Sequence, residues 1–170
     1  MADYKKLKPF ILKWEGGYVD DPLDKGGATN KGITLKTFQS VYGTSKTKED
    51  LKKLTDEQWD NIFRKYYWNR YRADEIQCQS LANICVDWVW ASGKWGITYV
   101  QDILGLTKDG IVGPKTINAI NEYKGGYKEL FDKIKQARIS YVNNIVQNNP
   151  SQKKFINGWM NRINSIKFCC

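Results

Sequence analysis

Four carboxylates stand close together in the first quarter of the sequence. They are Glu15, Asp20, Asp21 and Asp24. Glycoside hydrolysis needs one carboxylic acid that protonates the leaving oxygen, and usually a second carboxylate that activates water or stabilises an oxocarbenium-like transition state. The cluster alone is weak evidence for that chemistry, because acidic residues beside an Asp-Pro turn are typically solvated surface groups.

The residue types that other hydrolytic sites require are missing from the sequence. Its 170 residues include no histidine, and there is no Cys-x-x-Cys pair. This composition excludes Ser-His-Asp and Cys-His nucleophilic sites and the His-bearing zinc sites of hydrolases. A Gly-rich phosphate loop of the Walker type is also absent. We therefore expect no metal and no cofactor, and carboxylates remain as the groups for acid catalysis.

The hydrophobic spacing indicates which elements position Glu15. Apolar residues recur at helical intervals over residues 4–14, and the Gly-Gly pair after Glu15 is typical of a helix end. Glu15 is therefore predicted to lie at a helix terminus. Residues 18–32 have no period of either kind and are rich in turn formers, which predicts an ordered loop with room for a small hairpin.

The rest of the chain has the pattern of capped helices. Thr34, the Thr55-x-x-Gln58 capping box, Ser80 and Ser151 are expected to open helices, and Pro114 is expected at a first helical position. Apolar periodicity predicts these further helices at about residues 34–42, 55–66, 80–92, 99–104, 114–120, 127–149 and 151–166. The predicted fold is all-α, with about eight helices.

Charge and aromatic content indicate the kind of partner. Lys and Arg total 27 against 18 Asp and Glu, so the formal net charge of +9 should attract anionic partners such as nucleic acid, lipid or wall polymers. The basic residues are scattered and match no nucleic-acid motif, so nucleic acid is not an expected partner. Trp88, Trp90 and Trp95 lie close together, and at least one is expected to stack on a sugar ring, with burial the better expectation for Trp88.

Cysteine spacing and hydropathy indicate the redox state of the thiols and where the protein is made. Cys78 and Cys85 lie seven residues apart, too far to bridge along one helix, so reduced thiols are expected. The N-terminal residues lack the apolar core of an export signal, and no apolar run of about 18 residues occurs. We expect a protein made in the cytoplasm without a signal peptide and without stable membrane association.

Two stretches resemble a known family. Residues 14–19 (Trp-Glu-Gly-Gly-Tyr-Val), the Asp21-Pro22 turn, Asp24 and residues 26–34 (Gly-Gly-Ala-Thr-Asn-Lys-Gly-Ile-Thr) are similar to the signature of glycoside hydrolase family 108, a group of lysozyme-like N-acetylmuramidases. Residues 102–116, which contain Asp-Gly-Ile-Val-Gly-Pro, are similar to the peptidoglycan-binding segment that follows in that family. The two stretches occur in the expected order.

The resemblance implies roles for individual residues. Glu15 matches the catalytic glutamate, and Asp24 stands at the distance at which phage-type lysozymes place a second catalytic residue. Thr29 comes one residue before the expected threonine and Asn30 occupies the strict position, so the third catalytic role, which we assign to Thr29, stays open. The expected substrate-binding residues are Tyr18, Gly26, Gly27, Asn30, Asp87 and Trp90. A tight turn is the alternative for the glycines, and a structural hydrogen bond for Asp87.

Together these observations predict a monomeric, lysozyme-like protein with a single domain over residues 1–170. Within it, residues 1–93 form the catalytic segment and residues 94–170 the peptidoglycan-binding-like segment. The expected activity is hydrolysis of the β-1,4 bond between N-acetylmuramic acid and N-acetylglucosamine in bacterial peptidoglycan, after release of the protein to the cell wall. The alternatives are a lytic transglycosylase and a non-catalytic peptidoglycan-binding protein.

Overall fold

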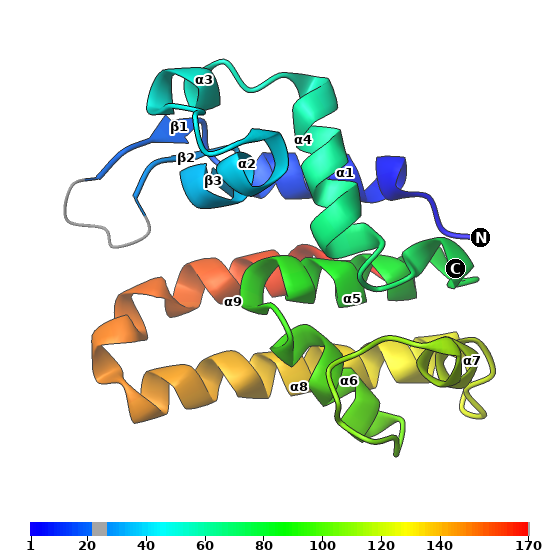
Figure 1. The fold of residues 1–170 in the computed structure, drawn as a ribbon. Coiled ribbons are helices and arrows are strands. Elements are labelled where there is room, and N and C mark those ends of the chain that lie inside the picture. Colours follow the sequence, from blue (N-terminus) through cyan, green and yellow to red (C-terminus); the bar gives the residue numbers. More distant parts are fainter. Residues whose placement is uncertain (22–26, 170) are drawn as a thin grey trace. The chain divides into compact units, whose positions relative to one another are not determined.

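A computed structural model describes residues 1–21 and 27–169, and it is mainly helical, as predicted (Figure 1). The chain divides into two compact units. The first, Tyr4–Tyr67, is called the N-terminal unit below; the second, Met1–Asp3 with Trp68–Cys170, is called the C-terminal unit. The single domain over residues 1–170, with a division near residue 93, stays a prediction.

The N-terminal unit combines short helices with a small antiparallel sheet. Its elements are α1 (Tyr4–Trp14), β1 (Tyr18–Val19), β2 (Thr29–Asn30), β3 (Ile33–Thr34), α2 (Leu35–Tyr42), α3 (Lys48–Lys52), α4 (Asp56–Phe63) and the π-helix η1 (Arg64–Trp68), which crosses the unit boundary. The two caps predicted in this unit are confirmed: the Thr34 hydroxyl accepts from the Thr37 N–H, and Thr55 and Gln58 form a reciprocal capping box. Helix α3 was not predicted.

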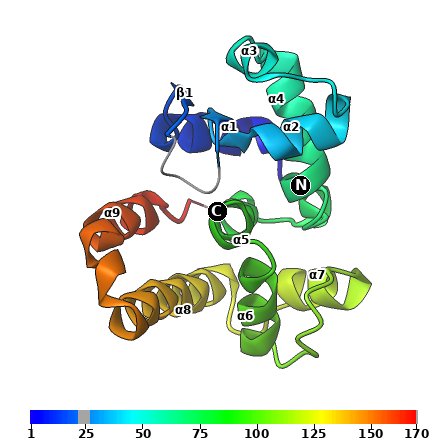
Figure 2. The same ribbon diagram turned by 60° about the vertical axis from the view of Figure 1, so that its left-hand side comes forward.

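Helix α1 is held in the N-terminal unit by its buried apolar face and by ion pairs with α4. Leu7 and Ile11 are buried, one turn apart on the same face of the helix. Between them, the Lys8 ammonium lies 2.7 Å from an Asp56 carboxylate oxygen and 2.6 Å from an Asp60 oxygen. Burial opposes the charged form of Lys8, but these two carboxylates outweigh it and raise its pKa. The two helices lie against each other in both ribbon views (Figures 1 and 2).

The C-terminal unit is helical throughout its described elements. They are η2 (Ala73–Glu75), α5 (Gln79–Ser92), α6 (Trp95–Ile103), α7 (Pro114–Asn121), α8 (Tyr127–Asn148), η3 (Pro150–Phe155) and α9 (Ile156–Ser165). Helix α5 is buried along most of its length and packs on α6 and α8, as Figure 2 shows with α5 seen end on. Helices α8 and α9 form an antiparallel pair joined through η3 (Figure 1).

Two helix starts differ from the prediction. Helix α5 begins at Gln79 with Cys78 as its N-cap, while Ser80 is buried inside the first turn, where its hydroxyl accepts a hydrogen bond from the Cys169 N–H at 2.8 Å. Ser151 does not cap the last helix either, because Pro150 opens a 3-10 helix that runs to Phe155 before α9 starts. In both cases a tertiary contact or a neighbouring proline overrides the local capping preference.

The expectation of reduced thiols is wrong for Cys78, which is disulfide-bonded. The separation of seven residues excludes only a bridge between Cys78 and Cys85 along one helix, and it does not exclude a partner elsewhere in the chain. Cys85 and Cys169 are free. Burial raises the pKa of the Cys85 thiol to about 12, so that this thiol stays protonated and unreactive at neutral pH.

A buried ion cluster joins three helices of the C-terminal unit. Asp87 on α5 is 0% exposed, and its carboxylate oxygens lie 2.8 Å from Arg138 Nη1 on α8 and 2.7 Å from Arg162 Nη2 on α9. Burial lowers the pKa of Arg138, against the opposing effect of Asp87. One carboxylate thus satisfies two guanidinium groups, and its loss would leave two like charges together inside the unit.

We predict that Asp87→Ala lowers the free energy of unfolding by about 3–5 kcal/mol, because it removes the carboxylate to which the buried Arg138 guanidinium donates. Chemical denaturation followed by circular dichroism measures the change. The matched control is Asp132→Ala, which removes an exposed ion pair with Lys128 at 2.7 Å and should cost less than about 1 kcal/mol. Equal effects of the two substitutions would contradict a structural role for the buried cluster.

Candidate active site

Glu15 follows directly after α1, as the apolar spacing predicted. Its backbone N–H continues the helical pattern by donating to the Ile11 carbonyl at 3.1 Å, and its side chain is half-buried. The next residues, Gly16 and Gly17, are exposed, and a Cβ added at either would meet no atom within 4 Å. The Glu15 carboxyl group at the end of α1 is thus followed by glycine backbone that is open to solvent.

The sheet that follows Glu15 is a three-stranded antiparallel meander in the order β1-β2-β3. Strands β2 and β3 are joined by two residues, Lys31 and Gly32, with φ values of 51° and 82°. Two consecutive positive φ values are typical of the type I′ turn, whose twist matches that of a two-residue hairpin. The small hairpin allowed for in the sequence is therefore present.

Asn30 ties this hairpin to the neighbouring helices. Its side chain is 5% exposed, and its Nδ2 donates to the carbonyl of Leu51 at 2.8 Å and to that of Lys52 at 3.4 Å, near the end of α3. At the next residue, the Lys31 carbonyl accepts a hydrogen bond from Trp59 Nε1 on α4 at 3.0 Å. The amide of Asn30 is committed to the protein interior, and its predicted contact with substrate stays a prediction.

Thr29 lies on the opposite face of the sheet from Asn30, because successive side chains of a strand point to opposite sides. Its cross-strand neighbours are Val19, which is exposed, and Thr34. Thr29 itself is half-buried. Of the two candidates for the third catalytic position, the geometry favours Thr29 as the one that a solvent-side ligand can reach.

The other acidic residues and the predicted sugar contacts near Glu15 have different surroundings. The carboxylate of Asp20 lies 3.0 Å from the Lys48 ammonium, and this hydrogen bond raises the pKa of Lys48. The ring of Tyr18 has the ammonium of Lys52 5.0 Å from its centroid. Gly27 is half-buried with a φ of 72°, a conformation that favours glycine. Asp24 and Gly26 lie outside the described residues.

The two remaining predicted site residues belong to α5 in the C-terminal unit. Asp87 is buried with its carboxylate oxygens on arginines, which favours the structural alternative over contact with substrate. Trp90 is half-buried, whereas Trp88 is fully buried, as expected. The ring of Trp88 stacks on that of Tyr99 with 5.5 Å between centroids.

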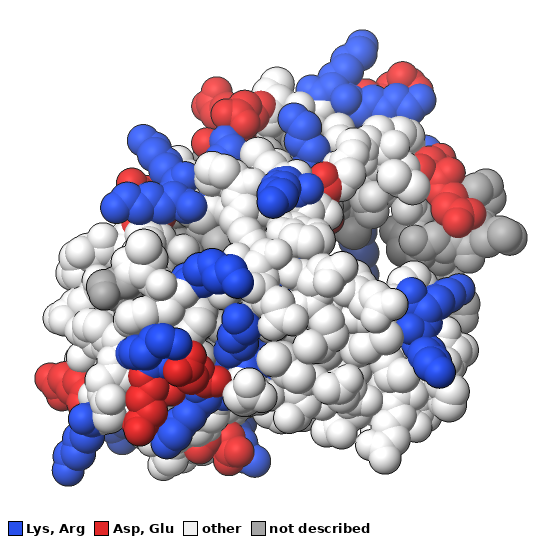
Figure 3. Space-filling model, turned by 180° about the vertical axis from the view of Figure 1, so that it is seen from behind, with Lys and Arg blue, Asp and Glu red and all other residues white. Residues whose placement is uncertain are grey.

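Figure 3 shows Lys and Arg side chains scattered over one face among uncharged residues, with Asp and Glu between them. In residues 1–21 and 27–169, no group of three or more His, Cys, Asp or Glu side chains is arranged to hold a metal ion. No described helix is both long and apolar enough to cross a membrane.

A family model covers most of the N-terminal unit and the first part of the C-terminal unit. The model of glycosyl hydrolase 108 matches residues 8–93, just over half of the chain, and this range includes Glu15 and the whole sheet. The chain belongs to the glycosyl hydrolase 108 family. A second model, described as a predicted peptidoglycan domain, matches residues 95–164 of this glycosyl hydrolase 108 protein.

A solved structure is also similar to this member of the glycosyl hydrolase 108 family. The structure of Brucella abortus SagA matches with a TM-score of 0.81 and 30% sequence identity, covering 96% of this chain and 90% of that chain. A search of curated proteins gave no match. The protein is therefore a glycoside hydrolase by family, and the second model indicates peptidoglycan as its substrate or partner.

We predict that Asn30→Asp lowers the free energy of unfolding by about 1–3 kcal/mol, because a carboxylate cannot donate to the α3 carbonyls that the amide now satisfies. Thermal and chemical unfolding measure the loss. Asn61→Asp is the matched control: Asn61 is exposed, and its Nδ2 donates to the Tyr42 hydroxyl, so that its replacement should cost less than about 0.5 kcal/mol. An Asn30→Asp protein as stable as the control would argue against the anchoring role.

Proposed function

We propose that this glycosyl hydrolase 108 protein is an N-acetylmuramidase. It hydrolyses the β-1,4 bond between N-acetylmuramic acid and N-acetylglucosamine in bacterial peptidoglycan, with Glu15 as the general acid. Two findings support the substrate: the glycosyl hydrolase model spans Glu15, and the peptidoglycan domain model covers most of the remaining chain. The formal net charge of +9 suits an enzyme that must approach an anionic wall polymer.

The placement of Glu15 is the observation on which the proposal rests. A general acid must be held at hydrogen-bonding distance from the oxygen that it protonates, and a side chain on a rigid element meets this requirement best. Glu15 continues α1, which Lys8 and two buried apolar residues fix to α4 and to the core. Its half-buried carboxyl group stands next to exposed glycine backbone, where a bulky sugar would find no obstructing side chain.

The proposed reaction uses two carboxyl groups of the protein and one water molecule, and it needs no cofactor. The Glu15 carboxyl group donates its proton to the glycosidic oxygen while the bond from that oxygen to the anomeric carbon breaks, and the carbon becomes oxocarbenium-like. A second carboxylate, which we assign to Asp24, stabilises this cation or accepts a proton from the attacking water. The water oxygen then bonds to the anomeric carbon, and the proton that the water loses goes to the Asp24 carboxylate or, where Asp24 only stabilises the cation, to the Glu15 carboxylate formed in the first step. The hydroxyl of Thr29, on the outward face of the sheet, would help to orient that water.

We predict that Glu15→Gln lowers the rate of reducing-end release from purified peptidoglycan at least about a hundredfold, because an amide has no acidic proton to donate. The circular dichroism spectrum should not change, since Gln is similar in size. Glu57→Gln, at an exposed glutamate in the first turn of α4, is the matched control and should keep wild-type activity. A Glu15→Gln protein within a few fold of wild type would refute the assignment.

Substitutions at the two aspartates and at Thr29 identify the carboxylate that acts together with Glu15. Asp24→Asn should reduce activity at least about tenfold more than Asp20→Asn, because it removes an anion from the transition state, whereas the Asp20 charge is already paired with Lys48. Thr29→Ala should have an intermediate effect, because it loses a hydroxyl but no charge. Initial rates at matched thermal stability decide the order. If Asp24→Asn is nearly silent while Asp20→Asn is damaging, the second carboxylate lies elsewhere.

A further inference from the structure

Three exposed large apolar side chains of the C-terminal unit lie on α6 and the loop that follows it. Trp95 is 46% exposed and Tyr99 37% exposed, one turn apart on α6, and Ile111 in the following loop is 70% exposed. A large aromatic ring usually loses most of its exposure on folding. Aromatic surface that stays open at one place is therefore typical of a binding site rather than of the surface at large.

Trp95 and Tyr99 line one hollow of about 380 Å³. This volume is within the range of about 300–1,000 Å³ that is usual for small-molecule sites. The two rings lie 6.3 Å apart between centroids at an angle of 58°. One face of Tyr99 stacks on the buried Trp88, and Tyr141 meets it edge to face, so the ring is held firmly in place.

The loop that carries Asp109, which also lines the hollow, is fixed by a buried glutamine. Gln101 Nε2 donates to the Asp109 carboxylate and to the Ile111 carbonyl, each at 3.0 Å, and Gln101 Oε1 accepts from the Gly110 N–H at 3.1 Å. Gly110 has a φ of 74°, and a Cβ added there would lie 3.6 Å from the Thr98 methyl group. The Asp-Gly-Ile-Val-Gly-Pro stretch is thus folded tightly onto α6, and the hollow has a rigid frame.

The charged groups of the hollow are not equally available to a ligand. Hydrogen bonds from the Ile111 N–H and from Gln101 hold the Asp109 carboxylate and lower its pKa. Asp102 lies 3.7 Å from the Lys108 ammonium. Lys94 makes no ion pair with any described residue, and its ammonium rests 5.1 Å from the centroid of the Trp95 ring. The Lys94 ammonium, next to the exposed ring of Trp95, can therefore pair with an anionic ligand.

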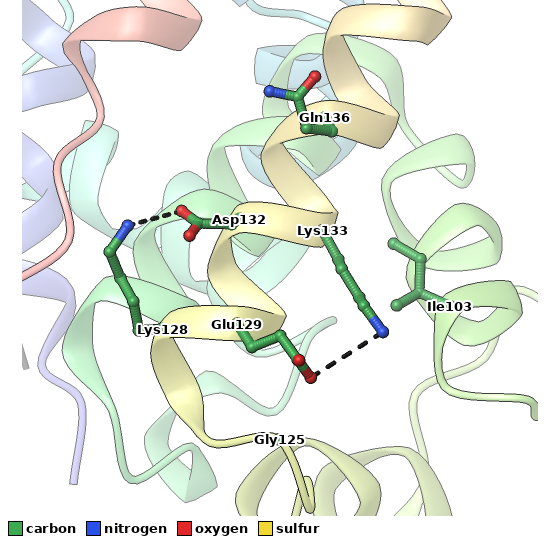
Figure 4. Close-up of a pocket in the computed structure, with 7 residues that line it drawn as sticks. All are labelled: Ile103, Gly125, Lys128, Glu129, Asp132, Lys133 and Gln136. Carbon is green, nitrogen blue, oxygen red and sulfur yellow. Dashed lines mark hydrogen bonds and ion pairs between the residues drawn. The ribbon is translucent and has the colours of Figure 1, made fainter.

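A second, larger hollow on α8 lacks these features. It is lined by Ile103, Gly125, Gln136 and four charged residues that project from α8 (Figure 4). The charged residues satisfy one another along the helix: Lys128 pairs with Asp132 at 2.7 Å, and Lys133 with Glu129 at 3.9 Å. Among these described residues there is neither an aromatic ring nor an unpaired cation, so we do not assign the hollow a ligand.

We propose that the Trp95–Tyr99 hollow binds peptidoglycan at a sugar residue that has a carboxylate close to it. The apolar face of a pyranose ring would stack on the aromatic rings, and the carboxylate would pair with Lys94. The carboxylate belongs either to the stem peptide or to the lactyl group of muramic acid that has lost its peptide. The inference rests on the proposed action on peptidoglycan, and it gives the C-terminal unit a glycan site of its own.

Binding to isolated peptidoglycan, measured by co-sedimentation in a Glu15→Gln background so that bound strands stay intact, tests the aromatic part. Trp95→Ala should weaken binding about five- to tenfold, the effect expected from losing one stacked ring. The matched control is Phe155→Ala, because Phe155 is 44% exposed but lies outside the hollow. Its affinity should stay within about twofold of the parent. Equal affinities of the two variants would overturn the proposal.

Lys94→Gln, at an exposed position that does not endanger folding, tests the charged part. This substitution should weaken binding to peptidoglycan a few fold and leave the binding of a neutral N-acetylglucosamine oligomer unchanged. The carboxylate assignment would be overturned if binding to peptidoglycan did not change, or if binding to both ligands weakened equally. Tighter binding of intact peptidoglycan than of amidase-stripped strands would identify the stem peptide, and the reverse order the lactyl group. A wild-type protein that releases no reducing ends would refute the muramidase function alone, since sedimentation is measured without turnover.

Discussion

The buried amide of Asn30 is the interaction on which the candidate active site depends. A strand of two residues makes too few ladder hydrogen bonds to be stable by itself. By donating to the last carbonyls of α3, Asn30 converts a marginal hairpin into part of the N-terminal unit. The same contact holds the outward face of β2, which carries Thr29. It also holds β1, which follows Glu15 in the chain and pairs with β2.

The C-terminal unit is organised by buried polar groups in a comparable way. Asp87 joins α5 to α8 and α9 through two arginines, and Gln101 fastens the loop after α6 to that helix. Apolar packing alone would allow such helices several similar arrangements, whereas a buried charge or amide is satisfied in only one geometry. In this protein such groups fix both the helix cluster and the hollow beside Trp95.

The sequence predicted the features that depend on local signals. The caps at Thr34 and Thr55, the proline at the start of α7 and the helix end at Glu15 follow from neighbouring residues, and the structure confirms them. The partners of Asp87 could not be predicted, because they lie 51 and 75 residues away along the chain. The disulfide of Cys78 could not be predicted for a similar reason, because the spacing of two cysteines along one helix gives no information about distant segments. The alternation of a strand separates Thr29 from Asn30, but only the contacts with α3 show which of them faces inward.

The identity of the cleavage products is the most direct test of the account. Purified peptidoglycan should be digested to completion with the wild-type protein and the soluble fragments analysed by mass spectrometry. Acid catalysis by Glu15 with attack by water predicts fragments that end in a reducing N-acetylmuramic acid, each with one water added. Fragments that end in an anhydro sugar would contradict hydrolysis and identify a lytic transglycosylase, and a digest without soluble glycan fragments would contradict cleavage of the strands altogether.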